Sequence, residues 1–146
     1  MIFSRRKRRI TRLMIVEDEP LVAFDTEHVL RDDQFEIVAT VDRAAEAIAI
    51  IARDAMIDLI LADYQLADGE GTAVAEAAQR AGIPIIFVAG ICPPAAQALA
   101  HGHLAKPYQP RDLVQAILTL DRVLQGDGPG RLPNGFTLFD QPVRSI

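Results

Sequence analysis

The sequence predicts an α/β fold, a doubly wound parallel sheet of five strands with helices on both faces. Short apolar runs alternate with segments of helical period from residue 12 to about residue 125. Strands that alternate with helices form parallel sheets through right-handed crossovers. The chain has 146 residues, 50% of them hydrophobic, which suffices for one domain with its own core. Aromatic residues make up only 5%, so we expect this core to be aliphatic.

Five apolar runs supply the predicted strands. The first, third and fourth are continuous apolar runs, as expected of strands buried on both faces of a sheet. The third run stops abruptly at Asp63. The five strands are predicted over residues 13–16, 36–40, 59–62, 84–88 and 103–105.

Helices are predicted after each of these strands. The first has Pro20 in its first turn, where the missing N–H costs nothing. Asp42 is predicted to cap the second helix, which has a clear apolar stripe. An alanine-rich third helix closes at Gly82. Two prolines at 93–94 predict a short or irregular fourth helix, and the fifth begins at Pro110 with one apolar face.

The charge distribution divides the chain into three parts, residues 1–11, 12–125 and 126–146. Residues 1–12 hold six lysines and arginines and no acid, which leaves 9 basic against 20 acidic residues beyond them. We expect residues 1–11 to be a basic, disordered leader. Residues 126–146 begin as a glycine-rich linker. The later part of this extension is consistent with either a turn and a short strand or a loose tail.

Composition also excludes several classes of protein. A single cysteine, Cys92, rules out an internal disulfide. Prolines interrupt the longest uncharged stretch, 81–100, and no apolar segment long enough for a secretory signal follows the basic leader before Glu17, so neither a membrane span nor a secretory signal is expected. We therefore expect a cytoplasmic protein without membrane contact. The 21 residues after Gln125 are too few for a helix-turn-helix, so no direct DNA binding is expected.

Charged residues follow three of the predicted strands. Glu17 and Asp18 follow the first strand, Asp63 the third, and Lys106 the last. Taken singly, such acids are common as helix caps or solvated loop residues. Together they meet at the carboxyl edge of the sheet, where open α/β sheets bind ligands. Unpaired carboxylates about 5 Å apart repel by roughly 3 kcal/mol per pair, and a divalent cation with oxygen ligands, such as Mg²⁺, relieves that repulsion.

The same residues carry a resemblance to a known family. The strings IVEDEP (15–20), LILADYQLADGEG (59–71), IPIIFVAG (83–90) and LAKPY (104–108) resemble the receiver domain of two-component response regulators over residues 12 to about 125. The resemblance implies a flavodoxin-like fold with strand order 2-1-3-4-5. It also implies a partner, either a sensor histidine kinase or a histidine phosphotransfer protein.

Receiver domains also imply a role for each matching residue. Asp63 would be the phosphoacceptor, and Lys106 would pair with a phosphoryl oxygen. The backbone N–H of Gly90 would be a further hydrogen-bond donor to the phosphoryl group, and Pro107 would follow a cis peptide bond. The ligands of Mg²⁺, or of Mn²⁺ in its place, would be Asp18, Asp63 and the backbone carbonyl of Gln65, with Glu17 bound through water.

Two positions depart from the family pattern. The switch hydroxyl, a Thr or Ser at the end of the fourth strand, is replaced by Ala89, and the aromatic switch partner is replaced by His103. Phe87 and Gly90 partly match the Phe-Ala-Thr-Gly-x-Tyr motif of an alphaproteobacterial subgroup. A hydrogen bond to a charged group contributes about 1.5–3 kcal/mol. Its loss at Ala89 therefore predicts weaker coupling between phosphorylation and the active shape.

These observations favour a single-domain response regulator that accepts a phosphoryl group on Asp63 and signals through an unknown protein partner. It is not expected to be an enzyme beyond its own phosphotransfer and slow dephosphorylation. The alternative is a receiver-like binding module that acts largely independently of phosphorylation, because Ala89 lacks the switch hydroxyl. A Mg²⁺ phosphohydrolase is disfavoured, since it requires an Asp-x-Asp at the end of the first strand and Glu17-Asp18-Glu19 does not supply one.

Overall fold

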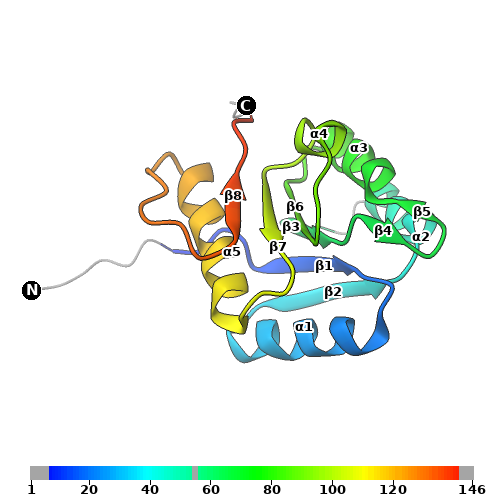
Figure 1. Ribbon diagram of the computed structural model, residues 1–146, viewed down its shortest axis with the longest axis horizontal. Coiled ribbons are helices and arrows are strands. Elements are labelled where there is room, and N and C mark those ends of the chain that lie inside the picture. The colour runs from blue at the N-terminus through cyan, green and yellow to red at the C-terminus, as the bar shows by residue number, and fades with distance from the viewer. Residues whose placement is uncertain (1–6, 54–55, 142–146) are drawn as a thin grey trace, which may run out of the picture.

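The computed structural model describes residues 7–53 and 56–141 and has a central six-stranded sheet. Its strands are β1 (Arg12–Val16), β2 (Glu36–Val41), β3 (Leu59–Ala62), β6 (Ile85–Ala89), β7 (Gly102–Ala105) and β8 (Phe136–Leu138). Their order is β2-β1-β3-β6-β7-β8 (Figure 1). The first five are parallel and confirm the predicted order 2-1-3-4-5. The sixth, β8, is the short strand that was one of the two alternatives for the C-terminal extension. It pairs antiparallel with β7, so the sheet has one strand more than the five predicted for it.

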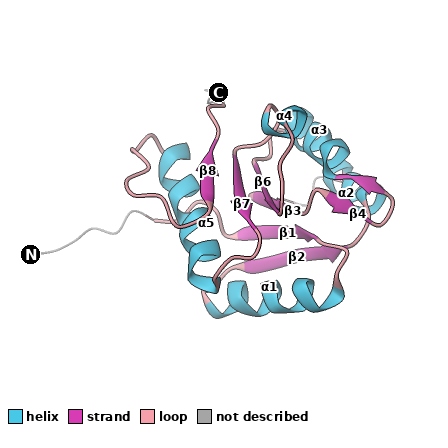
Figure 2. Ribbon diagram, viewed as in Figure 1, coloured by secondary structure: helices cyan, strands magenta, loops and turns pink. Residues whose placement is uncertain are grey.

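Helices cover both faces of this sheet (Figure 2). α1 (Pro20–Asp32) and α5 (Pro110–Leu124) pack on one face, and α2 (Ala44–Ala52), α3 (Gly71–Ala81) and α4 (Pro94–Gln97) on the other. The four-residue α4 confirms that the two prolines shorten this helix. No helix in the described part of the chain is long and apolar enough to cross a membrane.

The first strand shows why the central runs are continuously apolar. Leu13 and Ile15 join the hydrophobic cluster under α1 and α5, whereas Met14 and Val16 join the cluster under α2 and α3. Successive side chains of a strand point to opposite faces, and all four of these side chains are buried. Each face therefore needs an apolar residue at every second position.

The cap of α2 differs from the prediction. A small hairpin, β4 (Gln65–Leu66) and β5 (Gly69–Glu70), follows β3. Asp68 in its turn accepts hydrogen bonds from the backbone N–H groups of Ala44 and Ala45 at 2.6 and 3.0 Å. The predicted cap Asp42 was therefore wrong, because a carboxylate distant in sequence occupies the start of the helix. These two hydrogen bonds also lower the pKa of Asp68.

Part of the N-terminal segment packs against the domain. Ile10 is buried, and the buried carboxylate of Asp121 accepts hydrogen bonds from the backbone N–H groups of Arg9 and Ile10 at 3.0 and 3.2 Å. The Arg8 guanidinium lies 4.7 Å from the centre of the Phe35 ring. Residues 8–11 therefore differ from the disordered leader predicted over 1–11, because a buried apolar side chain and a buried carboxylate anchor them. Residues 1–6 lie outside the described part of the chain.

Candidate functional site

Three carboxylates meet where β1 and β3 end. Glu17 and Asp18 follow β1, and Asp63 follows β3. One carboxylate oxygen from each of the three lies within 4.8 Å of the others. The two strands are neighbours in register, with Val16 beside Ala62, so the parallel pairing brings the acids that follow them together. The structure thus places side by side the three acids that the sequence analysis singled out.

Lys106 joins this cluster from the end of β7. Its Nζ lies 2.6 Å from Glu17 Oε1 and 2.9 Å from Asp63 Oδ2. Burial tends to lower the pKa of Lys106, but the hydrogen bonds and charges of Asp63 and Glu17 outweigh burial and raise this pKa. The lysine therefore stays a cation that bridges two carboxylates. Pro107 follows a cis peptide bond.

Glu17 is the most enclosed of the three acids, with its side chain 6% exposed. Its Oε2 accepts a hydrogen bond from the backbone N–H of Glu19 at 3.1 Å. Burial raises the pKa of Glu17 more than its hydrogen bonds to Lys106 and Glu19 lower it. A buried carboxylate that lacks full compensation favours a further cation nearby.

The carboxylate of Asp63 has two different environments. Oδ1 accepts hydrogen bonds from the backbone N–H of Tyr64 at 2.6 Å and of Gln65 at 3.4 Å, while Oδ2 faces Lys106. Its side chain is 12% exposed. These contacts fix the orientation of the carboxylate and leave it at the rim of the sheet, where a ligand can reach it.

Gly71, the first residue of α3, packs against the loop that carries Asp63. A Cβ at Gly71 would lie 2.6 Å from the backbone oxygen of Asp63 and 2.6 Å from the Phe87 ring. Its N–H also donates to the Tyr64 carbonyl at 2.6 Å. The lack of a side chain at Gly71 therefore allows α3 to begin directly against the loop that carries Asp63.

The two departures from the family pattern meet at one backbone oxygen. The carbonyl of Ala89 accepts a hydrogen bond from the backbone N–H of Lys106 at 3.0 Å, and His103 Nε2 lies 2.9 Å from the same oxygen. Ala89 is buried, and Gly90 next to it is exposed. His103, which stands where the family has an aromatic side chain, thus contacts the backbone of Ala89, which stands where the family has a hydroxyl. Nothing in the sequence pattern indicated this contact.

The geometry suits a cation and an anion bound together. Carboxylate oxygens and backbone carbonyls are the ligands of Mg²⁺ and similar ions, and the candidates here are Glu17, Asp18, Asp63 and the backbone of Gln65. The Lys106 ammonium supplies a positive charge to the same cluster through Glu17 Oε1 and Asp63 Oδ2. This residue set therefore fits a divalent cation, and it can stabilise negative charge that arrives at Asp63.

Comparison with known proteins agrees with this geometry. A family model described as the response regulator receiver domain matches residues 13–118. The phyllosphere-induced regulator PhyR of Methylorubrum extorquens is 32% identical over 116 residues, which cover 73% of this chain and 42% of PhyR. The chain spans about half the length of the curated relatives it matches.

Solved structures show the same similarity. The structure of the anti-anti-sigma factor PhyR from Bartonella quintana matches with a TM-score of 0.64 and 28% identity, covering 82% of this chain and 50% of that one. A CheY-like response regulator receiver domain from Methanospirillum hungatei matches with a TM-score of 0.65 and 28% identity, covering 75% of this chain and 91% of that one. Because the family model matches residues 13–118 and the parallel sheet places the acids at one edge, the chain belongs to the family of response regulator receiver domains.

Proposed function

We propose that this receiver accepts a phosphoryl group on Asp63 from the phosphohistidine of a sensor kinase or a histidine phosphotransfer protein, in a reaction that depends on Mg²⁺. The observation that carries this proposal is the convergence of three carboxylates within 4.8 Å and of Lys106 at 2.9 Å from Asp63. A partly exposed carboxylate oxygen beside cations is a suitable nucleophile for phosphoryl transfer.

The reaction needs little acid–base chemistry from the protein. A carboxylate oxygen of Asp63 forms the new bond to phosphorus while the bond from phosphorus to the donor imidazole nitrogen breaks and its electron pair returns to that nitrogen. Mg²⁺ held by Glu17, Asp18, Asp63 and the Gln65 carbonyl would offset the charge of the phosphoryl oxygens. Lys106, which bridges Glu17 and Asp63 here, is close enough to bind a phosphoryl oxygen, and the exposed Gly90 N–H is a further donor.

Phosphorylation by a small donor tests this proposal directly. The full chain should gain a phosphoryl group from acetyl phosphate with Mg²⁺ or Mn²⁺ and lose that ability with a chelator, as followed by intact-mass spectrometry. The variant Asp63→Asn should remain unmodified, whereas Asp140→Asn, which changes an exposed acid in the C-terminal extension, should react like the parent chain. Modification of Asp63→Asn at the parent rate would disprove the choice of acceptor.

A second candidate function rests on Ala89. Because this residue has no hydroxyl and its carbonyl oxygen already contacts the Lys106 N–H and His103 Nε2, the second candidate is a receiver that binds its partner largely independently of phosphorylation. Amide NMR spectra with Mg²⁺ and beryllofluoride distinguish the two candidates. Shifts that reach α4, β7 and α5 support phosphorylation-driven signalling, and shifts confined to the surroundings of Asp63 support the binding module.

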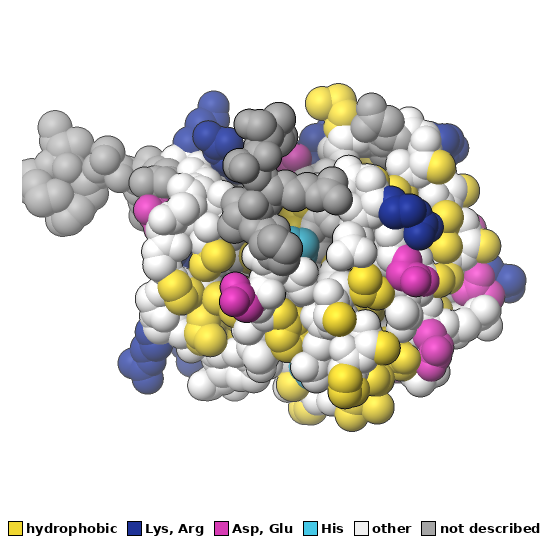
Figure 3. All heavy atoms as spheres, turned by 90° about the horizontal axis from the view of Figure 1, so that it is seen from above, with side chains coloured by type: hydrophobic (Ala, Val, Ile, Leu, Met, Phe, Trp, Pro, Cys, Tyr) yellow, Lys and Arg dark blue, Asp and Glu magenta, His cyan; other side chains and the backbone are white. Residues whose placement is uncertain are grey.

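We further propose that the output is a contact with another protein in the cytoplasm. PhyR of Bartonella quintana is named an anti-anti-sigma factor, a function that acts through protein partners. On the face seen in Figure 3, basic side chains of the described residues stand in small separate groups and do not form one continuous basic surface. Nucleic-acid binding depends on continuous basic surface, so this face supports protein contact over DNA contact.

A further inference from the structure

The added strand β8 covers what would otherwise be the edge of the sheet. It pairs with β7 in the register Gly102–Leu138, His103–Thr137 and Leu104–Phe136 (Figure 1). The ladder is extended at both ends, where Ala105 N–H donates to the Gly135 carbonyl at 2.9 Å and Phe139 N–H donates to the His101 carbonyl at 3.0 Å. An unpaired edge strand offers its N–H and C=O groups to any extended segment. Here residues 133–141, which we call the C-terminal segment, take that place.

A glycine in β7 gives this edge a specific shape. A Cβ at Gly102 would lie 2.7 Å from the Phe136 ring, so the ring occupies the space that any other residue at 102 would fill. Phe136 is 5% exposed and packs in the same hydrophobic cluster as Leu104 and Leu113. Leu138 lies two residues further along the strand and therefore on the same face as Phe136, while Thr137 between them is exposed. The edge thus suits a strand with an aromatic residue followed, two positions later, by an aliphatic one.

The far end of the C-terminal segment is held by one side chain. The Gln141 side-chain Nε2 lies 3.3, 3.1 and 2.7 Å from the carbonyl oxygens of Gln97, Ala98 and Ala100. The first carbonyl belongs to the last residue of α4, and the other two belong to the loop after it. Between this contact and Phe136, the segment is attached by the β7 ladder and by the partly buried side chains of Leu138 and Phe139.

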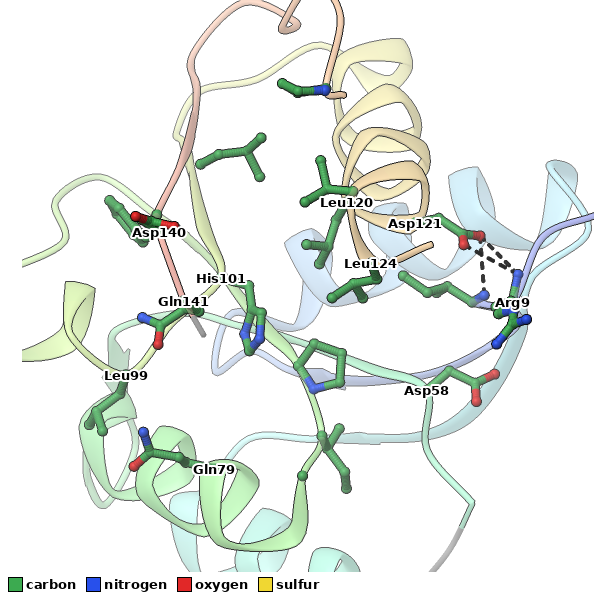
Figure 4. A pocket seen from close by; sticks show the side chains of 18 of the residues that line it. Arg9, Asp58, Gln79, Leu99, His101, Leu120, Asp121, Leu124, Asp140 and Gln141 are labelled. Carbon is green, nitrogen blue, oxygen red and sulfur yellow. Dashed lines mark hydrogen bonds between the residues drawn. The ribbon is translucent and has the colours of Figure 1, made fainter. Parts of the chain in front are cut away.

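The C-terminal segment lies over a hollow along part of its length. A cavity of about 910 Å³ has Leu138, Phe139, Asp140 and Gln141 in one wall and Leu120 and Leu124 of α5 in another. Figure 4 shows His101 between these walls. Its Nδ1 is buried and has no hydrogen-bond partner among the described residues. Atoms that line a void lose packing contacts, so this half of the segment is less firmly packed than Phe136.

The linker before β8, residues 126–132, allows the C-terminal segment to detach from β7 without disturbing the rest of the fold. Residues 126–132 contain three glycines and are mostly exposed, and Gly126 and Gly130 have positive φ angles. A three-residue strand on such a linker can open locally while the parallel sheet stays intact.

We propose that the edge of β7 is a binding site for an extended peptide segment that carries an aromatic residue opposite Leu104, with its ring over Gly102, and an aliphatic residue two positions later, opposite Gly102. In this structure the chain's own β8 occupies the site, and a segment of a partner protein with the same pattern replaces it by strand addition. The site is at the edge of the sheet and does not use Asp63 or Lys106, so it is independent of the proposed phosphorylation.

Hydrogen exchange of the full chain tests whether β8 opens separately. The amides of Ala105 and Phe139, which bond across this edge, should exchange at least about tenfold faster than the amide of Ile60, which bonds to the Pro84 carbonyl within the central sheet. Phe136→Ala should accelerate exchange of the first two amides by at least a further factor of about 100 and leave that of Ile60 nearly unchanged, because the variant loses the buried ring that anchors β8. Equal exchange rates for all three amides in the parent chain would overturn the proposal.

Binding of a foreign strand is tested with the full chain carrying a specific protease site in residues 127–131. A dye-labelled peptide with the sequence of residues 132–141 should bind the cleaved chain at least about tenfold more tightly than the uncleaved chain, as measured by fluorescence anisotropy, because covalent linkage gives β8 a high effective concentration.

Variants of the peptide and of the protein provide the controls. A peptide with Phe136→Ala should bind at least about 100-fold more weakly, whereas one with Thr137→Ala, changed at the exposed position, should bind within about threefold of the parent peptide. Gly102→Val in the protein should abolish peptide binding while Ile60 remains protected from exchange. Failure of the peptide to bind the cleaved chain, equal binding of the Phe136→Ala peptide, or exchange of β8 only between two copies of this chain would each overturn the proposal.

Discussion

Replacement of Lys106 by methionine tests the electrostatics of the site. The ammonium lies 2.6 Å from Glu17 and 2.9 Å from Asp63, and the two acid side chains are 6% and 12% exposed. Removal of one partner from a largely buried ion pair costs about 3–5 kcal/mol, because the remaining charges lose their compensation. We therefore expect Lys106→Met to lower the free energy of unfolding at pH 7 by about 3 kcal/mol in the absence of divalent cations.

Mg²⁺ should reduce this loss. Without the ammonium, three carboxylates within 4.8 Å repel one another by roughly 3 kcal/mol per pair at an effective dielectric of about 20. A cation that binds the folded state stabilises it by about 2.7 kcal/mol at a concentration 100 times its Kd. We expect Mg²⁺ to bind Lys106→Met at least about tenfold more tightly than the parent chain, because Lys106 no longer competes for the same oxygens.

The assay is urea denaturation of both chains, followed by circular dichroism, with and without 10 mM MgCl₂. The matched control is Arg31→Met, which removes an exposed ion pair with Glu27 on α1 and should change stability by less than about 0.5 kcal/mol at either Mg²⁺ concentration. If Lys106→Met lost the same stability with and without Mg²⁺, the argument that the three carboxylates form one cation site would be refuted.

Four further predictions concern single residues. Ala89→Thr should restore a hydroxyl at the switch position and enlarge the beryllofluoride-induced NMR shifts in α4 and β7, in line with roughly tenfold stronger coupling. Burial lowers the pKa of His101, so the folded state favours the neutral imidazole. The contribution of neutral His101 to the free energy of unfolding should be complete above pH 6.5, and it should fall below that pH by up to about 1.4 kcal/mol per pH unit. Denaturation curves at pH 7 and pH 5 should show this loss in the parent chain and not in His101→Gln. Asp68→Ala should lower the unfolding midpoint in the same measurement by removing the cap of α2, whereas Asp42→Ala should leave that midpoint nearly unchanged. Gly71→Ala should destabilise the chain by about 1–3 kcal/mol and slow phosphorylation from acetyl phosphate, because the new methyl group would collide with the Asp63 carbonyl.

Local patterns predicted the elements that depend on local chemistry. The apolar runs at 13–16 and 59–62, the proline at the start of α1 and Gly82 at the end of α3 all correspond to observed features. The positions of the acids were also predictable, because parallel strands present their carboxyl ends at one edge and Glu17, Asp18 and Asp63 directly follow such strands.

Features that depend on contacts between distant segments were not predictable. Asp42 and Asp68 are equally good cap residues by type, and only the hairpin after β3 brings Asp68 to the start of α2. The contact of His103 with the Ala89 carbonyl likewise requires the register of β6 with β7. A single sequence contains no signal for either contact, since both arise from packing between elements.

The sequence by itself determined the parallel α/β sheet and the acids at its edge, because periodicity and strand ends are local properties of the chain. Only the tertiary structure decided that Lys106 forms ion pairs with both Glu17 and Asp63. These contacts of 2.6 and 2.9 Å join residues that follow three different strands. It also decided the place of the C-terminal extension. Phe136 could have been part of a loose tail, but the absence of a side chain at Gly102 leaves room for its ring beside β7, and burial of that ring stabilises a sixth strand.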